Sequence, residues 1–175
     1  KQYRGRFLLV ANLPYSVASP VMLNLIKESP SVDGMYLTVQ KEVAERMTAG
    51  PGNKHYGTLS IFLSATGRVK TERVLKPTVF WPAPQVNSAM VSFTVKEEKI
   101  NRIKNIRLFG EIVSLFMQHR RKRVKTCTKF TTGRLAKITD FSEIFERAGI
   151  NPNDRPDQLS PQNYIEIANE CYNQA

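Results

Sequence analysis

The sequence Phe7-Leu8-Leu9-Val10-Ala11-Asn12-Leu13-Pro14-Tyr15 decides the fold class of this chain of 175 residues. Its first five residues are all apolar, which is typical of a buried strand in a parallel sheet. Leu13 precedes a proline and is therefore extended, so we expect the strand to end abruptly. The side chains that follow should lie at the carboxyl edge of the sheet, where open α/β sheets bind ligands.

Asn12, Leu13, Pro14 and Tyr15 place a carboxamide, exposed carbonyl groups and an aromatic ring at that edge. This combination suits a flat base with an exocyclic amine, whose lone pair is delocalised into the ring. The Asn12 side-chain oxygen and a main-chain carbonyl such as that of Leu13 would each accept one N–H and aim the lone pair at an electrophile. Tyr15 would stack on a base that has left its own stack. Taken alone, the tetrapeptide fits a strand-to-helix turn with a packed tyrosine equally well.

Three further segments follow in order: VQKEVAERMTAGPGNKHYGTLSIF from Val39 to Phe62, VFWPAPQVNSAMVSF from Val79 to Phe93, and FMQHRRKRVK from Phe116 to Lys125. With the tetrapeptide, and at these intervals, they resemble the dimethyladenosine transferases that modify small-subunit ribosomal RNA. The resemblance covers nearly the whole chain. It implies S-adenosylmethionine as methyl donor and, as substrate, two neighbouring adenosines near the RNA 3′ end, each dimethylated on N6.

The resemblance also implies roles for particular residues. The tetrapeptide Asn12–Tyr15 matches the catalytic motif of the family, and Asn12 is also the residue that we expect to contact the cofactor. Phe80 matches the family's aromatic residue that closes on the second face of the target adenine. For Trp81, in the same proline-rich loop, we favour a role as a hydrophobic plug between two domains.

Two features depart from the family pattern. Family members carry a glycine-rich cofactor loop after their first strand and an acidic residue after their second, but no G-x-G sequence precedes Phe7. We therefore expect this chain to be the C-terminal part of a longer enzyme and to bind the cofactor poorly by itself. Asn87 stands where the family often has aspartate, which bears on the subfamily.

Two other functions stay open. Enzymes that methylate large-subunit ribosomal RNA in antibiotic resistance share the mechanism, and Asn87 favours them, but they more often carry Asn-Ile-Pro-Tyr and lack a loop like the AGPGNKHYG of residues 49–57. A noncatalytic nucleic-acid-binding protein with the same fold is the other alternative. Such a protein need not retain Asn12, Pro14, Tyr15 and Phe80, so their presence argues against it.

The net charge of +11 is concentrated in the middle of the chain. Residues 96–137 carry a net charge of +10, compared with +6 for residues 1–95 and −5 for residues 138–175. The centre of this segment is a basic block at the end of an apolar-periodic helix, made up of Arg120, Arg121, Lys122, Arg123 and Lys125. Complementing a helix dipole takes one or two cations, not five, so we expect the basic block to bind RNA phosphates.

The rest of the composition narrows the class of protein. Hydrophobic residues make up 41% of the chain, enough for a core, and no apolar run approaches the length of a membrane span. Cys127 and Cys171 lack the spacing of metal ligands, so we expect reduced thiols and no metal site. His55 and His119 have no partner pattern, and we assign them no catalytic role. We expect a cytoplasmic protein that acts as a monomer.

The periodicities predict an α/β fold. Strands are expected at 7–11, 35–40, 67–75 and 86–96, the last two as an antiparallel pair, and helices from 19, from 41, near 59–63, over 105–123, near 125–138, near 142–148 and from 160. Residues 1–100 would form the C-terminal half of a Rossmann-like methyltransferase sheet with the catalytic residues. Residues 101–175 would form a small all-helical RNA-binding domain.

Overall fold

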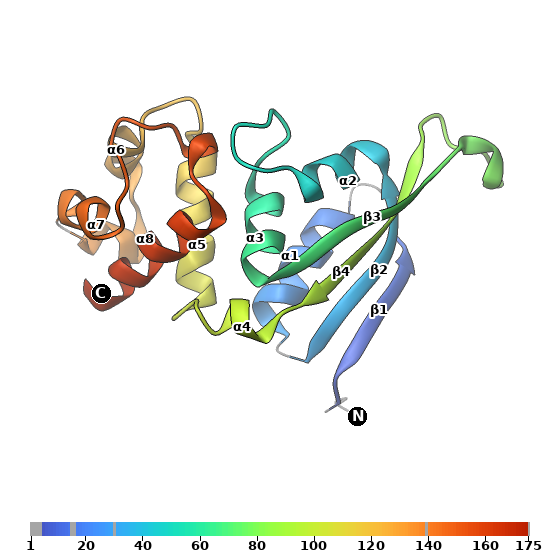
Figure 1. Cartoon of the computed structure of the whole chain (residues 1–175), viewed down its shortest axis with the longest axis horizontal. Helices are drawn as coiled ribbons and strands as arrows, with labels where there is room; N and C mark the ends of the chain where they lie inside the picture. Colours follow the sequence, from blue (N-terminus) through green and yellow to red (C-terminus); the bar gives the residue numbers. More distant parts are fainter. Residues whose placement is uncertain (1–4, 15–16, 30, 139, 175) are drawn as a thin grey trace.

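A computed structural model describes residues 5–14, 17–29, 31–138 and 140–174. Its strands and α-helices follow one another as β1 (Phe7–Asn12), α1 (Ala18–Glu28), β2 (Val32–Gln40), α2 (Lys41–Thr48), α3 (Thr58–Thr66), β3 (Gly67–Leu75), β4 (Ser88–Val95), α4 (Glu97–Ile100), α5 (Ile106–Gln118), α6 (Val124–Cys127), α7 (Phe141–Arg147) and α8 (Pro161–Gln174). Short 3₁₀ turns occupy Pro77–Val79, Thr128–Phe130, Gly133–Lys137 and Pro156–Gln158. Figure 1 shows the strands gathered at one end of the long axis and α5 to α8 at the other.

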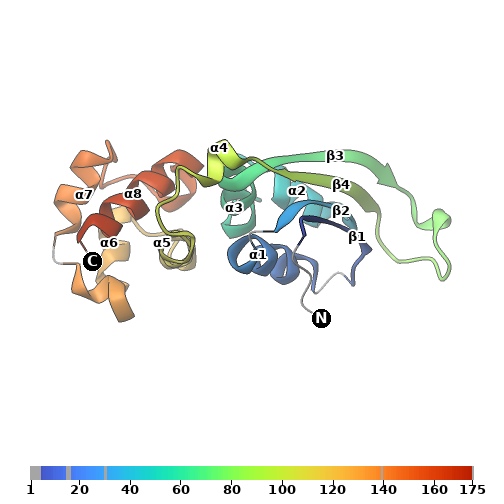
Figure 2. The same ribbon diagram turned by 90° about the horizontal axis from the view of Figure 1, so that it is seen from below.

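The four strands form one mixed sheet in the order β1-β2-β4-β3. β1 runs parallel to β2, with Asn12 opposite Thr38, while β4 is antiparallel to both β2 and β3. The expected antiparallel pair at the end of the sheet is therefore confirmed. Figure 2 shows α1, α2 and α3 on one face of the sheet. Side chains from that face, including Met35, Leu37 and Phe93, are buried against these helices.

The prediction that the first strand is buried is wrong for two of its five apolar residues. β1 is an edge strand, and Leu8 and Val10 are 57% and 75% exposed. The alternate residues Phe7, Leu9 and Ala11 pack against the core. In the part of the chain that the structure describes, no helix lies against the face to which Leu8 and Val10 point. An all-apolar run does not distinguish a strand covered on two faces from one covered on a single face.

The predicted helix over 105–123 is too long, because α5 ends at Gln118. The next residues turn instead: the N–H of His119 donates to the Phe116 carbonyl, and the N–H of Lys122 donates to the His119 carbonyl. The N–H of Val124 then bonds to the carbonyl of Asp154 at 2.8 Å, which redirects the chain into α6. Arg120 to Arg123 of the basic block therefore lie on a turn between two helices, and Lys125 lies on α6. The single helix expected near 125–138 is likewise divided into α6 and two 3₁₀ turns.

The helical part packs directly on the sheet's covering helices. The rings of Phe62 on α3 and Phe109 on α5 meet edge to face, with centroids 5.0 Å apart. Gly110 permits this approach, because a Cβ there would lie 3.2 Å from the Phe62 ring and 3.3 Å from Lys27 Cε. The ammonium of Lys27 lies 4.8 Å from the Phe62 ring centroid. Buried residues from both parts form one continuous core.

The loop between α2 and α3 is fastened to the segment that precedes α8. The N–H of Gly52 donates to the carbonyl of Asp157 at 2.7 Å. The hydroxyl of Tyr56, a fully buried residue, donates to the carbonyl of Leu159 at 2.9 Å. Burial raises the pKa of the Tyr56 hydroxyl far above its ordinary value, so this group stays a donor at all working pH values.

Replacing Tyr56 with phenylalanine should destabilise the fold by about 1–3 kcal/mol, because the Leu159 carbonyl would stay buried without its donor. Urea denaturation followed by circular dichroism measures the change. The matched control is Tyr172→Phe, since Tyr172 is half exposed on α8. Equal unfolding free energies for the two variants would contradict the role of this hydrogen bond.

Candidate active site

The tetrapeptide begins at the carboxyl end of β1, as expected from the sequence. Asn12 is the last residue of the strand and is exposed. The carbonyl of Pro14 accepts the N–H of Val17 at 3.0 Å, so Pro14 makes the turn that leads into α1. Tyr15 lies outside the described residues, and its stacking role stays a prediction.

A second loop reaches the same place from the connection between β3 and β4. The 3₁₀ turn Pro77–Val79 begins it, and the N–H of Phe80 donates to the carbonyl of Pro77 at 3.1 Å. The Trp81–Pro82 peptide bond is cis. Phe80 is half-buried. The prolines fix the course of this segment because their φ angles are restricted.

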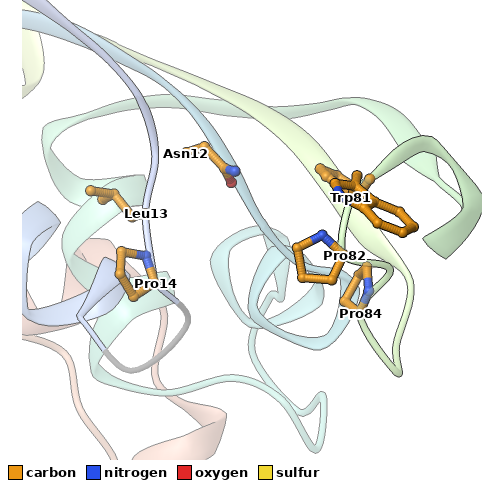
Figure 3. Close-up of a pocket in the computed structure, with 7 residues that line it drawn as sticks. Asn12, Leu13, Pro14, Trp81, Pro82 and Pro84 are labelled. Atoms are coloured by element: carbon orange, nitrogen blue, oxygen red, sulfur yellow. The ribbon is translucent and has the colours of Figure 1, made fainter.

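The two loops enclose a pocket of about 350 Å³, lined by Asn12, Leu13, Pro14, Phe80, Trp81, Pro82 and Pro84. Figure 3 shows the Asn12 carboxamide pointing towards the proline-rich loop. The structure thus brings Asn12 and Phe80 together from loops far apart in the sequence. The volume lies at the lower end of the range typical of sites for small planar ligands. None of the described lining residues is titratable, so these residues offer hydrogen-bond acceptors and flat surfaces, not a general base.

The prediction that Trp81 is a plug between two domains is wrong. Its side chain is 98% exposed, and its loop extends from the end of the sheet that is remote from α5 to α8 (Figure 1). The interface between the two parts is filled by Phe62 and Phe109 instead. Trp81 instead lines the pocket beside Pro82 and Pro84.

The residues of the basic block are not equivalent. Arg121, Lys122, Arg123 and Lys125 are exposed. Arg120 is half-buried, and its guanidinium lies 3.5 Å from both the Asp157 carboxylate and the Lys54 carbonyl oxygen. Arg120 therefore also braces the fastened loop, while the exposed members are available to a ligand. Figure 1 shows the turn between α5 and α6 at the opposite end of the long axis from the Trp81 loop.

The other polar groups that the sequence singled out take no part in the pocket. Cys127 and Cys171 are free and buried, and burial raises the pKa of their thiols to about 11 and about 12. Asn87 lines a separate hollow beside α2. Among the described residues there is no cluster of three or more potential metal ligands. Within those same ranges, no helix is both long and apolar enough to cross a membrane.

Comparison with models of known protein families shows to which family the chain belongs. The family model described as ribosomal RNA adenine dimethylase matches residues 1–173 of the chain. The chain belongs to this family. The resemblance drawn from the tetrapeptide and the three segments is thereby confirmed.

Curated relatives within the adenine dimethylase family share about a third of their residues with the chain. The ribosomal RNA small subunit methyltransferase A of Latilactobacillus sakei is 35% identical over 167 residues, which are 95% of this chain and 56% of that protein. The protein of the same name from Xylella fastidiosa is 36% identical over 169 residues, 97% of this chain and 61% of that protein. The chain thus spans about three fifths of the length of these relatives.

Solved structures establish the fold of this adenine dimethylase chain. The crystal structure of a dimethyladenosine transferase from Plasmodium falciparum superposes with a TM-score of 0.82 at 21% identity, covering 99% of this chain and 70% of that one. The 23S rRNA methyltransferase ErmE superposes with a TM-score of 0.66 at 14% identity, covering 98% and 68%. The predicted α/β class, with a Rossmann-like sheet followed by helices, is confirmed.

Proposed function

We propose that the protein uses S-adenosylmethionine to dimethylate N6 of two adjacent adenosines near the 3′ end of small-subunit ribosomal RNA during ribosome biogenesis. The observation that carries this proposal is the pocket shared by Asn12, Leu13 and Phe80. The names of relatives at 35–36% identity favour the small subunit as the source of the RNA. The large-subunit enzyme ErmE is the more distant structural neighbour.

The pocket residues suit an adenine amine. The carbonyl of Pro14 already accepts the N–H of Val17, so the carbonyl of Leu13 is the main-chain acceptor that we assign to the substrate. Together with the Asn12 side-chain oxygen it would hold the two N–H groups and direct the lone pair outwards. Phe80 supports one face of the base, and we assign the other face to Tyr15.

The bound cofactor supplies a methyl group on a positively charged sulfur. The Asn12 side-chain oxygen and the Leu13 carbonyl would hold the adenine nitrogen with its lone pair directed at that methyl group. Asn12 is the described residue that we assign to the methyl donor as well as to the base. Its carboxamide has both donor and acceptor groups and is exposed at the strand end, so its chemistry fits both partners.

The helical part supplies RNA affinity in this proposal. We place the boundary between a catalytic domain and a helical RNA-binding domain near residue 100, after the last strand. The exposed members of the basic block then contact the phosphates of ribosomal RNA or of a pre-ribosomal small subunit. We further propose that the protein acts as a monomer in the cytoplasm, where small subunits are assembled.

The test uses the protein at its natural length, with labelled S-adenosylmethionine and unmethylated small-subunit RNA. We expect N6,N6-dimethyladenosine in the digested RNA. Phe80→Ala should lower methyl transfer roughly 5- to 150-fold at limiting RNA, because stacking is worth about 1–3 kcal/mol per base. Val79→Ala is the matched control, since exposed Val79 precedes Phe80 but does not line the pocket. Labelling of large-subunit RNA alone would favour the antibiotic-resistance type, and RNA binding without any transfer would favour a noncatalytic protein.

A further inference from the structure

An aromatic pair of an exposed phenylalanine and a half-buried histidine lies beside the basic block, remote from the pocket of Asn12. The ring of Phe130 stacks on the imidazole of His119, with centroids 4.0 Å apart and planes inclined by 23°. The ammonium of Lys122 lies 5.3 Å from the centroid of the Phe130 ring. Phe130 nevertheless remains 41% exposed. Its ring is thus held in a fixed orientation by two neighbours while much of its surface faces solvent.

Phe130 is not needed to fill the core. The fully buried side chains of this segment are Val124 and Cys127, and Leu135 is 5% exposed in the turn that follows. An exposed phenylalanine that contributes little to the core yet is held by a histidine and a lysine is a candidate binding residue. Exposed aromatic rings with adjacent cations are the stacking surfaces that proteins offer to unpaired bases.

A hollow of about 350 Å³ opens next to the ring, between α5 and the turns after α6. Phe130 and Leu115 form apolar parts of its wall, and Ser114, Gln118 and Thr132 supply polar groups. The amide of Gln118 is held in place by donating to the hydroxyl of Ser114 at 3.1 Å. A carboxamide in a fixed position can pair with the edge of a base. The hollow therefore combines a stacking surface with hydrogen-bonding groups.

A second hollow, of about 510 Å³, adjoins the first through Gln118, which lines both. Its other lining residues are His119, Arg120, Arg121 and Lys122. The two hollows match the two parts of a nucleotide. The three cations can bind the negatively charged phosphate, and the aromatic ring beside them can stack on the flat base. An RNA duplex would meet the cations but could not present a base to Phe130.

We propose that the helical part binds one unpaired nucleotide of RNA at this place. The base stacks on Phe130 in the first hollow, and its phosphate lies against Arg121 and Lys122 in the second. This inference rests on the proposed function, since it assumes an RNA substrate, and it adds that the substrate is recognised through a single-stranded or bulged nucleotide distant from the methylated adenosines.

The test measures binding of the 175-residue chain to a short single-stranded RNA containing 2-aminopurine, whose fluorescence falls when it stacks on an aromatic ring. Phe130→Ala should weaken this binding roughly 5- to 150-fold and abolish the fluorescence change. Phe130→Trp should retain both. Affinity for a blunt RNA duplex should stay the same in both variants. Tyr172→Ala, which removes an exposed aromatic residue of α8, is the matched control.

Unchanged single-strand affinity in Phe130→Ala would overturn the nucleotide site, and so would an equal loss for single strand and duplex. Circular dichroism and thermal unfolding of each variant exclude a folding defect as the cause of lost affinity. The outcome is separable from that of the proposed function. If 2-aminopurine fluorescence falls but the natural-length protein transfers no methyl group, the nucleotide site is supported and the proposed enzymatic function is contradicted. If the protein transfers methyl groups but Phe130→Ala binds single-stranded RNA as the wild type does, the enzymatic function is supported and the nucleotide site is contradicted.

Discussion

Replacing Asn12 with alanine should reduce methyl transfer by a factor on the order of 10²–10³ while leaving RNA affinity nearly unchanged. The carboxamide is exposed at the end of β1 and lines the pocket with Leu13 and Phe80, so its loss removes an acceptor for the amine without removing a phosphate contact. The measurement is methyl incorporation into small-subunit RNA by the natural-length protein at saturating RNA, because saturation isolates the rate from binding.

The matched control is Asn24→Ala, which removes an exposed carboxamide from α1, outside the pocket lining. We expect the control to methylate at the wild-type rate. Near-wild-type turnover in Asn12→Ala would remove Asn12 from the mechanism. A loss of RNA affinity with an unchanged rate at saturating RNA would mean that Asn12 binds the ground state and the transition state equally, and would not support a role in orienting the amine.

The chemistry of the pocket explains why a carboxamide has so large an expected effect. An adenine amine is a weak nucleophile because its lone pair belongs partly to the ring, and none of the described residues lining the pocket is a titratable group that could act as a base. In the proposed function, rate enhancement would then come from fixing the nitrogen in a reactive geometry. Acceptors set in position by a strand end and a proline turn would do this without reorganising during the reaction.

Local sequence rules predicted the elements that carry the site. The abrupt end of β1, the helix from Lys41, the helix around residues 59–63 and the last helix after Ser160 are all where the sequence placed them. The sequence placed both the end of β1 and the Pro77–Pro84 loop near the carboxyl edge of the sheet, and Asn12 and Phe80 do line one pocket there. The role of Phe80 against the adenine was expected only through the family resemblance.

Exposure was the property that the sequence predicted least well. Leu8 and Val10 are apolar but lie on an open sheet face, and Trp81 is almost fully exposed on a proline-stiffened loop. Hydrophobicity gives the tendency of a residue to be buried, but burial depends on which other elements cover it. Phe130 was overlooked for a related reason, because its partner His119 belongs to a turn that the helical periodicity had continued as helix.

Replacing Arg121, Arg123 and Lys125 with serine should weaken RNA binding for all sequences alike and flatten its salt dependence. Each lost phosphate contact lowers the slope of log K against log salt by roughly 0.7 for a single strand and 0.9 for a duplex. All three side chains are exposed on the turn between α5 and α6 or on α6 itself. Arg120 is left in place, because it pairs with Asp157 and its removal would disturb the fastened loop.

A salt titration of the 175-residue chain and this triple variant measures the two slopes. The control carries the same loss of charge elsewhere, as Arg68→Ser, Arg73→Ser and Arg102→Ser, all exposed positions outside the basic block. Base preference should not change in the variant, since phosphate contacts position the RNA without reading its sequence. Methyl transfer by the natural-length variant should recover at high RNA concentration, because Asn12 and Phe80 are untouched. Equal slopes for wild type and variant would show that these three cations face solvent and contact no phosphate. The phosphate contacts would then have to be made by cations of the sheet-bearing part.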